Sequence, residues 1–226
     1  MQVGPPPADA EARWRKLYQE TFQISPPMSL LDFSIACNRA IRLRHSAAQA
    51  RGIQFPEILW PSILLEVLAG FAKLSEAAKA DFIAGQIQLG RTTKLMPGAA
   101  ETIRWLSEKR QLLGIASNAQ AYSLRELEGC LMDGGLDLRI FDPDLCYWSF
   151  QHGFSKPENH IFQIFRIRLE ARGITSPETL MVGDRVDNDI DPAQKHGFQT
   201  WLLSSTDTEK YAGNWKQLSE FLAYSV

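Results

Sequence analysis

Residues 180–190 read LMVGDRVDNDI, an apolar run that leads into a glycine and three aspartates. We predict a buried strand here, with Asp184 at its carboxyl end and Gly183 allowing close backbone approach. Asp187 and Asp189 follow within one loop. Several acids beside an apolar strand repel one another unless a cation lies among them, and hard oxygen ligands suit magnesium. The alternative is an acidic helix start, since aspartate favours first turns. We expect Asp184 and Asp189 to bind Mg²⁺.

Short apolar runs alternate with amphipathic helices on both sides of this stretch. Predicted strands cover residues 111–116, 146–149, 179–182 and 200–203. We expect the strand over residues 200–203 to be the last of the chain. Predicted helices cover residues 99–108, 123–132, 158–172 and 191–196. This alternation indicates an α/β fold with a parallel sheet and helices on both faces.

The preceding part of the chain, residues 8–90, reads as helices only. The first helix covers residues 8–22. Ser29 and Asp32 form a predicted capping box for the second, Pro56 fits the first position of the third, and Ser75 can cap a fourth. We therefore predict a helical domain over residues 1–92 and an α/β domain over residues 93–226.

Bulk properties exclude several classes of protein. A net charge of -2 lacks the basic excess typical of nucleic-acid binders. The three cysteines are widely spaced and form no CxxC, so we expect neither a disulfide framework nor a zinc site, and a reducing cytoplasm is the predicted location. Residues 1–7 do not resemble a signal peptide, and no run approaches the roughly 18 apolar residues of a membrane span. We expect no membrane or nucleic-acid partner, and the sequence does not indicate an oligomeric state.

Polar side chains also follow two other predicted strands, where ligands bind in open α/β sheets. Ser117 and Asn118 come after the strand over 111–116 and could hold a phosphate oxygen together with backbone amides. Both are also common helix caps. Lys156 follows the next strand, directly before Pro157, and could neutralise a phosphate and a carboxylate together. The alternative is a solvated surface lysine.

The three features occur in a fixed order, each after a strand, and their joint pattern resembles the haloacid dehalogenase-like hydrolase superfamily. Ser117 stands at that family's second motif, Lys156 at the third, and Asp184 with Asp189 at the fourth. The resemblance covers nearly the whole chain and implies a Rossmann-like core with an α-helical cap of the first subclass. It also implies catalytic roles for Lys156 and Ser117, phosphate binding by Ser117, Asn118 and Lys156, and Mg²⁺ at Asp184 and Asp189.

One feature of the family is missing from this sequence. The first motif is an Asp-x-Asp-Gly-Thr-like run at the end of a central strand, and its first aspartate attacks phosphorus. Here Asp9 follows a triple proline, which a central strand excludes, and Asp32 and Asp81 lie on predicted helices. Asp142-Pro143-Asp144 leads into a strand rather than out of one. We assign no nucleophile, expect the central first strand to be absent, and attribute the gap to a downstream start site or a truncated chain, with a true pseudoenzyme as the alternative.

The resemblance implies a magnesium-dependent phosphatase of a small organic phosphate in a complete chain, with this chain inactive as given. A 2-haloacid dehalogenase, which needs no metal, is one alternative, and the acid-rich loop fits it less well. A catalytically inactive binding or regulatory protein is another, favoured by the absent nucleophile. No GxGxxG, GK[ST] or GxSxG run supports a nucleotide-binding oxidoreductase or a serine hydrolase.

A basic cluster lies in the predicted cap. Arg39, Arg42, Arg44 and His45 lie close together in the sequence of the second predicted helix. They could face an anionic substrate, or they could form a solvated face, which is commoner for such runs.

Overall fold

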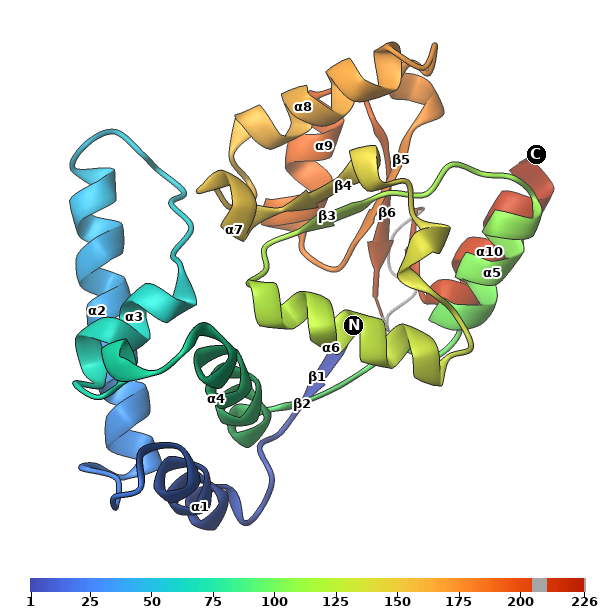
Figure 1. The fold of residues 1–226 in the computed structure, drawn as a ribbon. Coiled ribbons are helices and arrows are strands. Elements are labelled where there is room, and N and C mark those ends of the chain that lie inside the picture. Colours follow the sequence, from blue (N-terminus) through green and yellow to red (C-terminus); the bar gives the residue numbers. More distant parts are fainter. Residues whose placement is uncertain (205–210, 226) are drawn as a thin grey trace. The chain divides into compact units, whose positions relative to one another are not determined.

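The computed structural model describes residues 1–204 and 211–225 (Figure 1). It contains two compact units. The helical unit comprises residues 1–94 and 119–127, and the α/β unit comprises residues 95–118 and 128–226. No helix in the described ranges is both long and apolar enough to cross a membrane.

The helical unit is built around an aromatic core. Its elements are β1 (Gln2–Gly4), α1 (Ala10–Phe22), α2 (Leu30–Gln49), α3 (Trp60–Val67), η1 (Phe71–Lys73), α4 (Glu76–Gly90), β2 (Thr92–Lys94) and the first half of α6 (Ala121–Asp133). Trp14 is fully buried, stacks on Phe33 at 4.7 Å between ring centroids, and donates its indole N–H to the Met28 carbonyl. Because these two rings come from α1 and α2 and the carbonyl comes from the loop between them, the contacts hold the first two helices together.

The predicted helix starts at Ser29 and Ser75 are confirmed. The Ser29 hydroxyl oxygen accepts from the Asp32 backbone N–H at 3.1 Å, and Ser75 does the same for Ala78 at 3.2 Å. In the expected capping box the Asp32 carboxylate would accept from the Ser29 backbone N–H. Instead it accepts from the Ser29 hydroxyl at 2.7 Å, because aspartate is one methylene shorter than the glutamate usual at that position.

The predicted helix start at Pro56 is wrong, because α3 begins at Trp60. The buried carboxamide of Gln120 holds the preceding segment out of helical geometry. Its oxygen accepts from the Trp60 backbone N–H at 2.9 Å, and its nitrogen donates to the Ile58 carbonyl at 2.7 Å and to the Glu57 carboxylate at 2.9 Å. Gln120 lies about sixty residues away in the sequence, so local helix signals could not reveal this contact.

Residues 119–127 add further contacts within the helical unit. Arg91 forms an ion pair with Glu126 and lies over the Tyr122 ring, 5.5 Å from its centroid. Tyr122 meets Trp60 edge-on at 6.4 Å, and its burial raises the pKa of its hydroxyl to about 12. The first half of α6 is therefore part of the aromatic core of this unit.

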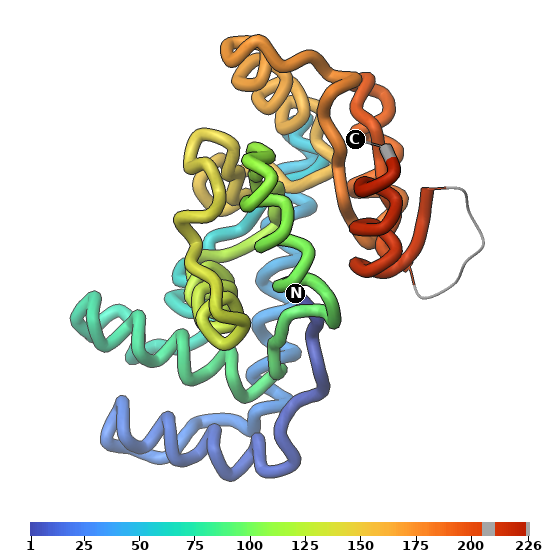
Figure 2. The backbone as a smooth tube through the Cα atoms, turned by 90° about the vertical axis from the view of Figure 1, so that its right-hand side faces the viewer, coloured from blue at the N-terminus to red at the C-terminus, as the bar shows by residue number. Residues whose placement is uncertain are grey.

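A short antiparallel pair was not predicted. β1 and β2 pair with Val3 opposite Thr93, and the two segments lie side by side (Figure 2). Residues 92–94 read TTK and lack the alternation of apolar and polar residues that marks a half-buried strand. Pairing between distant segments supplies the structure here.

The α/β unit has the predicted parallel strands. β3 (Ile115–Ser117) pairs with β4 (Cys146–Trp148), and β5 (Leu180–Gly183) pairs with β6 (Gln199–Leu203), which pairs with β7 (Ala212–Gly213). The helices are α5 (Ala99–Glu108), α7 (Ser149–His152), α8 (Asn159–Glu170), α9 (Asp191–Lys195), α10 (Trp215–Ser225) and the short turns η2 (Leu138–Ile140), η3 (Pro143–Leu145), η4 (Ser176–Glu178) and η5 (Val186–Ile190).

The prediction gave α5 its observed bounds and placed most other elements within a few residues. The strand predicted from residue 111 begins only at Ile115, because Gly114 passes so close to the Leu145 carbonyl oxygen that a Cβ would lie 2.4 Å from it. The prediction that residues 200–203 form the last strand is wrong, since β7 and then α10 follow. β7 has only two residues, too few for a sequence pattern.

The parallel strands form two separate ladders rather than one. Within the described ranges no strand joins β3 to β5. All three residues of β3 and the first three of β5 are only half-buried, whereas Tyr147 and Trp148 of β4 are buried. Ile161 and Phe162 of α8 belong to a core cluster that also includes Tyr147 of β4 and, at its margin, Met181 of β5. The helix α8 thus packs into a core shared by both ladders. The apolar side chains of β3 and β5 are only half-buried.

Candidate active site

Lys156 is the centre of the predicted site. Its ammonium donates to the Ala116 carbonyl at 2.7 Å and to Asp189 Oδ1 at 2.5 Å. The side chains of Lys156 and Asp189 are only 10% and 6% exposed, so Lys156 is not the solvated surface lysine of the alternative reading. Because Ala116 belongs to β3 and Asp189 follows β5, one ammonium group bridges the carboxyl ends of both ladders.

Asn118 lies directly after β3 and contacts the backbone of Lys156. Its Oδ1 accepts from the Lys156 N–H at 2.6 Å, and its Nδ2 donates to the Lys156 carbonyl at 3.0 Å. Ser117, the last residue of β3, pairs with Trp148 of β4 and is half-buried. The structure therefore brings Ser117, Asn118 and Lys156 to one edge of the α/β unit, as the sequence predicted.

Asp189 is held against the strand that precedes it. A Cβ on Gly183 would lie 2.3 Å from the Asp189 Cβ, so only glycine fits at the end of β5. The five residues of η5 form a turn of π-helix, and Asp189 Oδ2 accepts from the Arg185 backbone N–H at 3.1 Å. This wide turn directs one carboxylate of an acidic segment inward, so Asp189 is buried while Asp184 and Asp187 are exposed.

The other two aspartates of the loop have different surroundings. Asp184 is exposed at the tip of β5. Asp187 is exposed as well and forms an ion pair with Arg185 at 2.6 Å, and that guanidinium lowers the pKa of the Asp187 carboxyl. The three acids therefore comprise an exposed carboxylate at the strand tip, an exposed ion pair and a buried ion pair.

The donor set fits a weakly held Mg²⁺. An ionised carboxylate offers about four lone-pair positions, of which Asp189 uses two on Lys156 and Arg185. Asp184 and the remaining Asp189 positions are hard oxygen donors, and magnesium commonly keeps several waters beside one or two carboxylates. In the part of the chain that the structure describes, no group of three or more His, Cys, Asp or Glu side chains could hold a metal. The proposed ion would thus be mostly hydrated.

We expect the Asp184→Asn variant to bind Mg²⁺ about tenfold more weakly than the parent. A tenfold change in affinity corresponds to a loss of roughly 1.4 kcal/mol in binding free energy. Asp187→Asn is the matched control, since it removes an acid from the same loop that is already paired with Arg185. Calorimetric titration with MgCl₂ measures both. Equal affinities of parent and Asp184→Asn would remove Asp184 from the metal site.

The basic residues of the cluster in the predicted cap all lie on α2 but have different surroundings. The Arg44 guanidinium bonds to Glu66 and to Ser62, and together with His45 it lines a hollow of about 280 Å³ that also includes Glu57 and Ile58. Arg39 and Arg42 are exposed. Because Arg44 already has a carboxylate partner, this cluster presents less positive charge than its sequence suggests.

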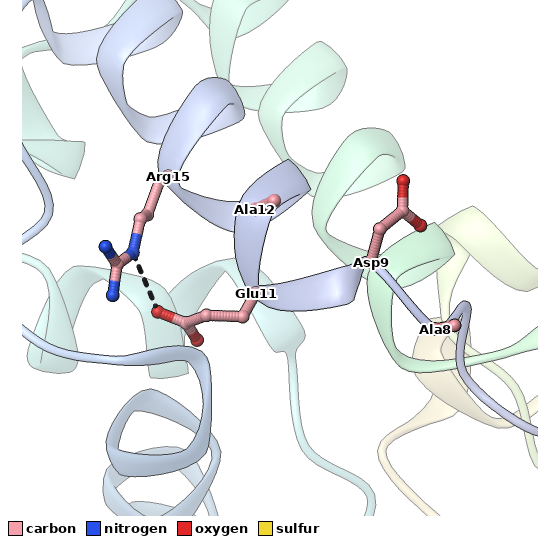
Figure 3. A pocket seen from close by; sticks show the side chains of 5 residues that line it. All are labelled: Ala8, Asp9, Glu11, Ala12 and Arg15. Carbon is pink, nitrogen blue, oxygen red and sulfur yellow. Dashed lines mark hydrogen bonds and ion pairs between the residues drawn. The ribbon is translucent and has the colours of Figure 1, made fainter.

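A second hollow, of about 390 Å³, lies at the start of α1 (Figure 3). It is lined by Ala8, Asp9, Glu11, Ala12 and Arg15. Glu11 and Arg15 bond to each other at 3.1 Å, one turn apart on the helix. Both hollows belong to the helical unit, and neither includes a residue of the predicted site.

Three contacts of this site could not be predicted from sequence. The Ala116 carbonyl has no side-chain signature, and the bonds between Asn118 and Lys156 join residues 38 positions apart. Arg185 contributes its backbone N–H to Asp189, a role that carries no residue preference. The only usable signal was the position of each polar residue after a strand.

Comparison with known proteins places the chain in a family. The haloacid dehalogenase-like hydrolase family matches residues 28–197. Solved structures with a similar fold include 2-haloacid dehalogenase from Pseudomonas syringae pv. Tomato, with 21% identity, TM-score 0.54, and coverage of 96% of this chain and 90% of that one.

Two other similar structures contain magnesium. YfnB, a HAD-hydrolase of Bacillus subtilis bound to magnesium, has 19% identity, TM-score 0.52 and coverage of 94% and 91%. A HAD family enzyme of Bacteroides thetaiotaomicron, in complex with magnesium and inorganic phosphate, has 14% identity, TM-score 0.53 and coverage of 92% and 91%. A search of curated proteins finds no significant match. Since the family match spans most of the sequence, the chain belongs to the haloacid dehalogenase-like hydrolases.

Proposed function

We propose that this chain forms the phosphate- and magnesium-binding part of a phosphatase that acts on a small organic phosphate. The observation that carries this proposal is the buried Lys156 ammonium, which bonds to β3 and to the turn after β5, with the exposed carboxylate of Asp184 at the tip of β5. Phosphoryl transfer depends mainly on positioning and on neutralising charge. A cationic group and a hard-metal site at the same strand ends suit that chemistry. Structural relatives with magnesium and phosphate bound add support.

The residues of this chain would bind and orient the phosphate. A lysine ammonium has three N–H donors, and Lys156 uses two on Ala116 and Asp189, which leaves one for a phosphate oxygen. The hydroxyl of Ser117 and the backbone amides after β3 could serve the other oxygens. Magnesium, when bound, would supply further neutralisation of phosphate charge. The nucleophile would be an aspartate on a segment that this sequence does not contain.

We expect Lys156→Ala to weaken binding of inorganic phosphate in the presence of MgCl₂. A charge-assisted hydrogen bond of roughly 1.5–3 kcal/mol corresponds to about a ten- to hundredfold loss of affinity. Lys195→Ala, which removes an exposed lysine from α9, is the control. Isothermal titration with phosphate measures the effect. Unchanged affinity in Lys156→Ala would contradict the assignment of Lys156 to phosphate.

A second candidate function is a binding protein without turnover. It is favoured by one absence: among the residues that the structure describes, no aspartate directly follows a strand except Asp184, which is already assigned to the metal. Phosphate binding without hydrolysis, in this chain and in every longer form, would support it. Dehalogenation remains the third candidate, and release of halide from a 2-haloacid without added magnesium would favour it over both.

A further inference from the structure

The bonds of Asn118 indicate a role different from the one its sequence position suggests. Its carboxamide accepts from the N–H of Lys156 and donates to the carbonyl of the same residue, at 2.6 and 3.0 Å. A neighbouring strand would bond to the backbone in the same manner, with one acceptor for the N–H and one donor for the C=O of a single residue. Although Asn118 is an exposed residue, its two polar atoms therefore face the Lys156 backbone.

Lys156 is thus held at both ends by one short stretch of chain. Asn118 holds its backbone, and the Ala116 carbonyl, two residues earlier, accepts from its ammonium at 2.7 Å. A lysine side chain has four flexible methylenes and would otherwise populate many rotamers. Fixing the backbone and the tip together sets the position of the ammonium before any ligand arrives, which lowers the ordering cost of binding.

We infer that Asn118 is a positioning residue for Lys156 rather than a phosphate ligand. The inference rests on the proposed phosphate site and narrows the roles within it. Asn118 uses its carbonyl oxygen and one of its two N–H groups on Lys156, so it acts on bound phosphate through the lysine. The expected signature is a loss of order at Lys156 when the carboxamide is removed, even without phosphate.

The first test measures Lys156 directly. Acetic anhydride acylates accessible amines, and mass spectrometry gives the rate at each lysine. In the parent, Lys156 with a 10% exposed side chain should react several-fold more slowly than Lys216, whose side chain is 81% exposed. In Asn118→Ala the Lys156 rate relative to Lys216 should rise several-fold. Asn38→Ala, on the exposed part of α2, is the control and should leave that ratio unchanged.

A folding defect would have a different signature. Lys79 of the helical unit has a side chain only 19% exposed and pairs with Glu76. Asn118→Ala should leave its rate unchanged, whereas global unfolding would raise the rates of Lys79 and Lys156 together. Asn118→Asp keeps an oxygen for the Lys156 N–H but cannot donate to the carbonyl, and should give an intermediate rate. An unchanged Lys156 rate in folded Asn118→Ala would overturn the inference.

The second test is a double-mutant cycle on inorganic phosphate affinity with MgCl₂ present. If Asn118 acts through Lys156, Asn118→Ala lowers affinity several-fold in the parent and has no effect in Lys156→Ala. If Asn118 binds phosphate directly, it lowers affinity by the same factor in both backgrounds, and the inference fails. Absence of phosphate binding in the parent would contradict the proposed function, while the acylation rates would still decide whether Asn118 positions Lys156.

Discussion

This chain is expected to show no phosphatase turnover, whereas a form extended by an apolar strand that ends in Asp-x-Asp-Gly-Thr or a close variant should hydrolyse phosphate monoesters with magnesium. The chemistry needs a carboxylate opposite the phosphate that is not committed elsewhere. Asp189 is bound to Lys156, Asp187 to Arg185, and Asp184 is assigned to the metal. The expected difference in rate is on the order of 10⁴ or more, the scale at which loss of a nucleophile acts in other hydrolases.

The two separate strand ladders also indicate that a strand is missing between β3 and β5. β3 and β5 belong to separate ladders, and both are half-buried despite apolar sequences. A strand between them would satisfy backbone groups on both sides and cover the side chains of Ile115 and Val182. Without it the chain should aggregate more readily, as unpaired strand edges do. The extension should therefore raise thermal stability as well as activity.

The measurement is hydrolysis of a panel of phosphate monoesters with and without MgCl₂. The matched control is the extended form with its first motif aspartate changed to asparagine, which restores the strand but not the nucleophile. That control should be stable and inactive. Robust, metal-dependent turnover by the 226-residue chain would show that another group attacks phosphorus, and an upstream reading frame that lacks such a run would favour the binding-protein candidate.

Asp189→Ala is expected to destabilise the α/β unit by about 3–5 kcal/mol, because it leaves the buried Lys156 ammonium without its counter-charge. Asp187→Ala is the control from the same turn. Its ion pair with Arg185 joins side chains that are 66% and 60% exposed, so its loss should cost far less than loss of the buried pair. Urea denaturation followed by tryptophan fluorescence compares the two.

A third variant separates charge from packing. Asp189→Ala combined with Lys156→Met removes both charges and should recover part of the lost stability, since replacing a buried ion pair as a whole is far less costly than breaking it. If Asp189→Ala costs no more than Asp187→Ala, the ion pair is not a stabilising element of the fold. If the double variant is as unstable as Asp189→Ala, the loss comes from packing of Asp189 against Gly183.

The sequence predicted those parts of the fold that depend on local pattern. The strand predicted over residues 179–182 and the helix predicted over residues 99–108 were found because each has a local apolar pattern. The helix start predicted at Pro56 is wrong because the distant carboxamide of Gln120 fixes the segment before Trp60. The boundary after residue 92 stays a prediction. Contacts between residues that lie tens of positions apart set such element boundaries. A local sequence pattern therefore cannot predict them.

For the candidate site, the sequence predicted which residues lie at strand ends but not how each is used. Asp184, Asp187 and Asp189 look equivalent in the printed sequence, yet a turn of π-helix buries only Asp189. Asn118 was expected to face phosphate, and its bonds go to Lys156 instead. The direction of a side chain depends on backbone geometry, which position after a strand does not determine.

The division of α6 between the two units bears on how chains of this family could exchange parts during evolution. The helical unit includes residues 119–127, and Gln120 supplies three of its internal hydrogen bonds. A recombination event that replaced residues 1–94 alone would leave Gln120 and Tyr122 behind, facing a foreign surface without their partners. A viable graft would have to carry a second, non-contiguous piece of chain. Helical units of this type are therefore expected to diverge by point substitution more readily than by transfer.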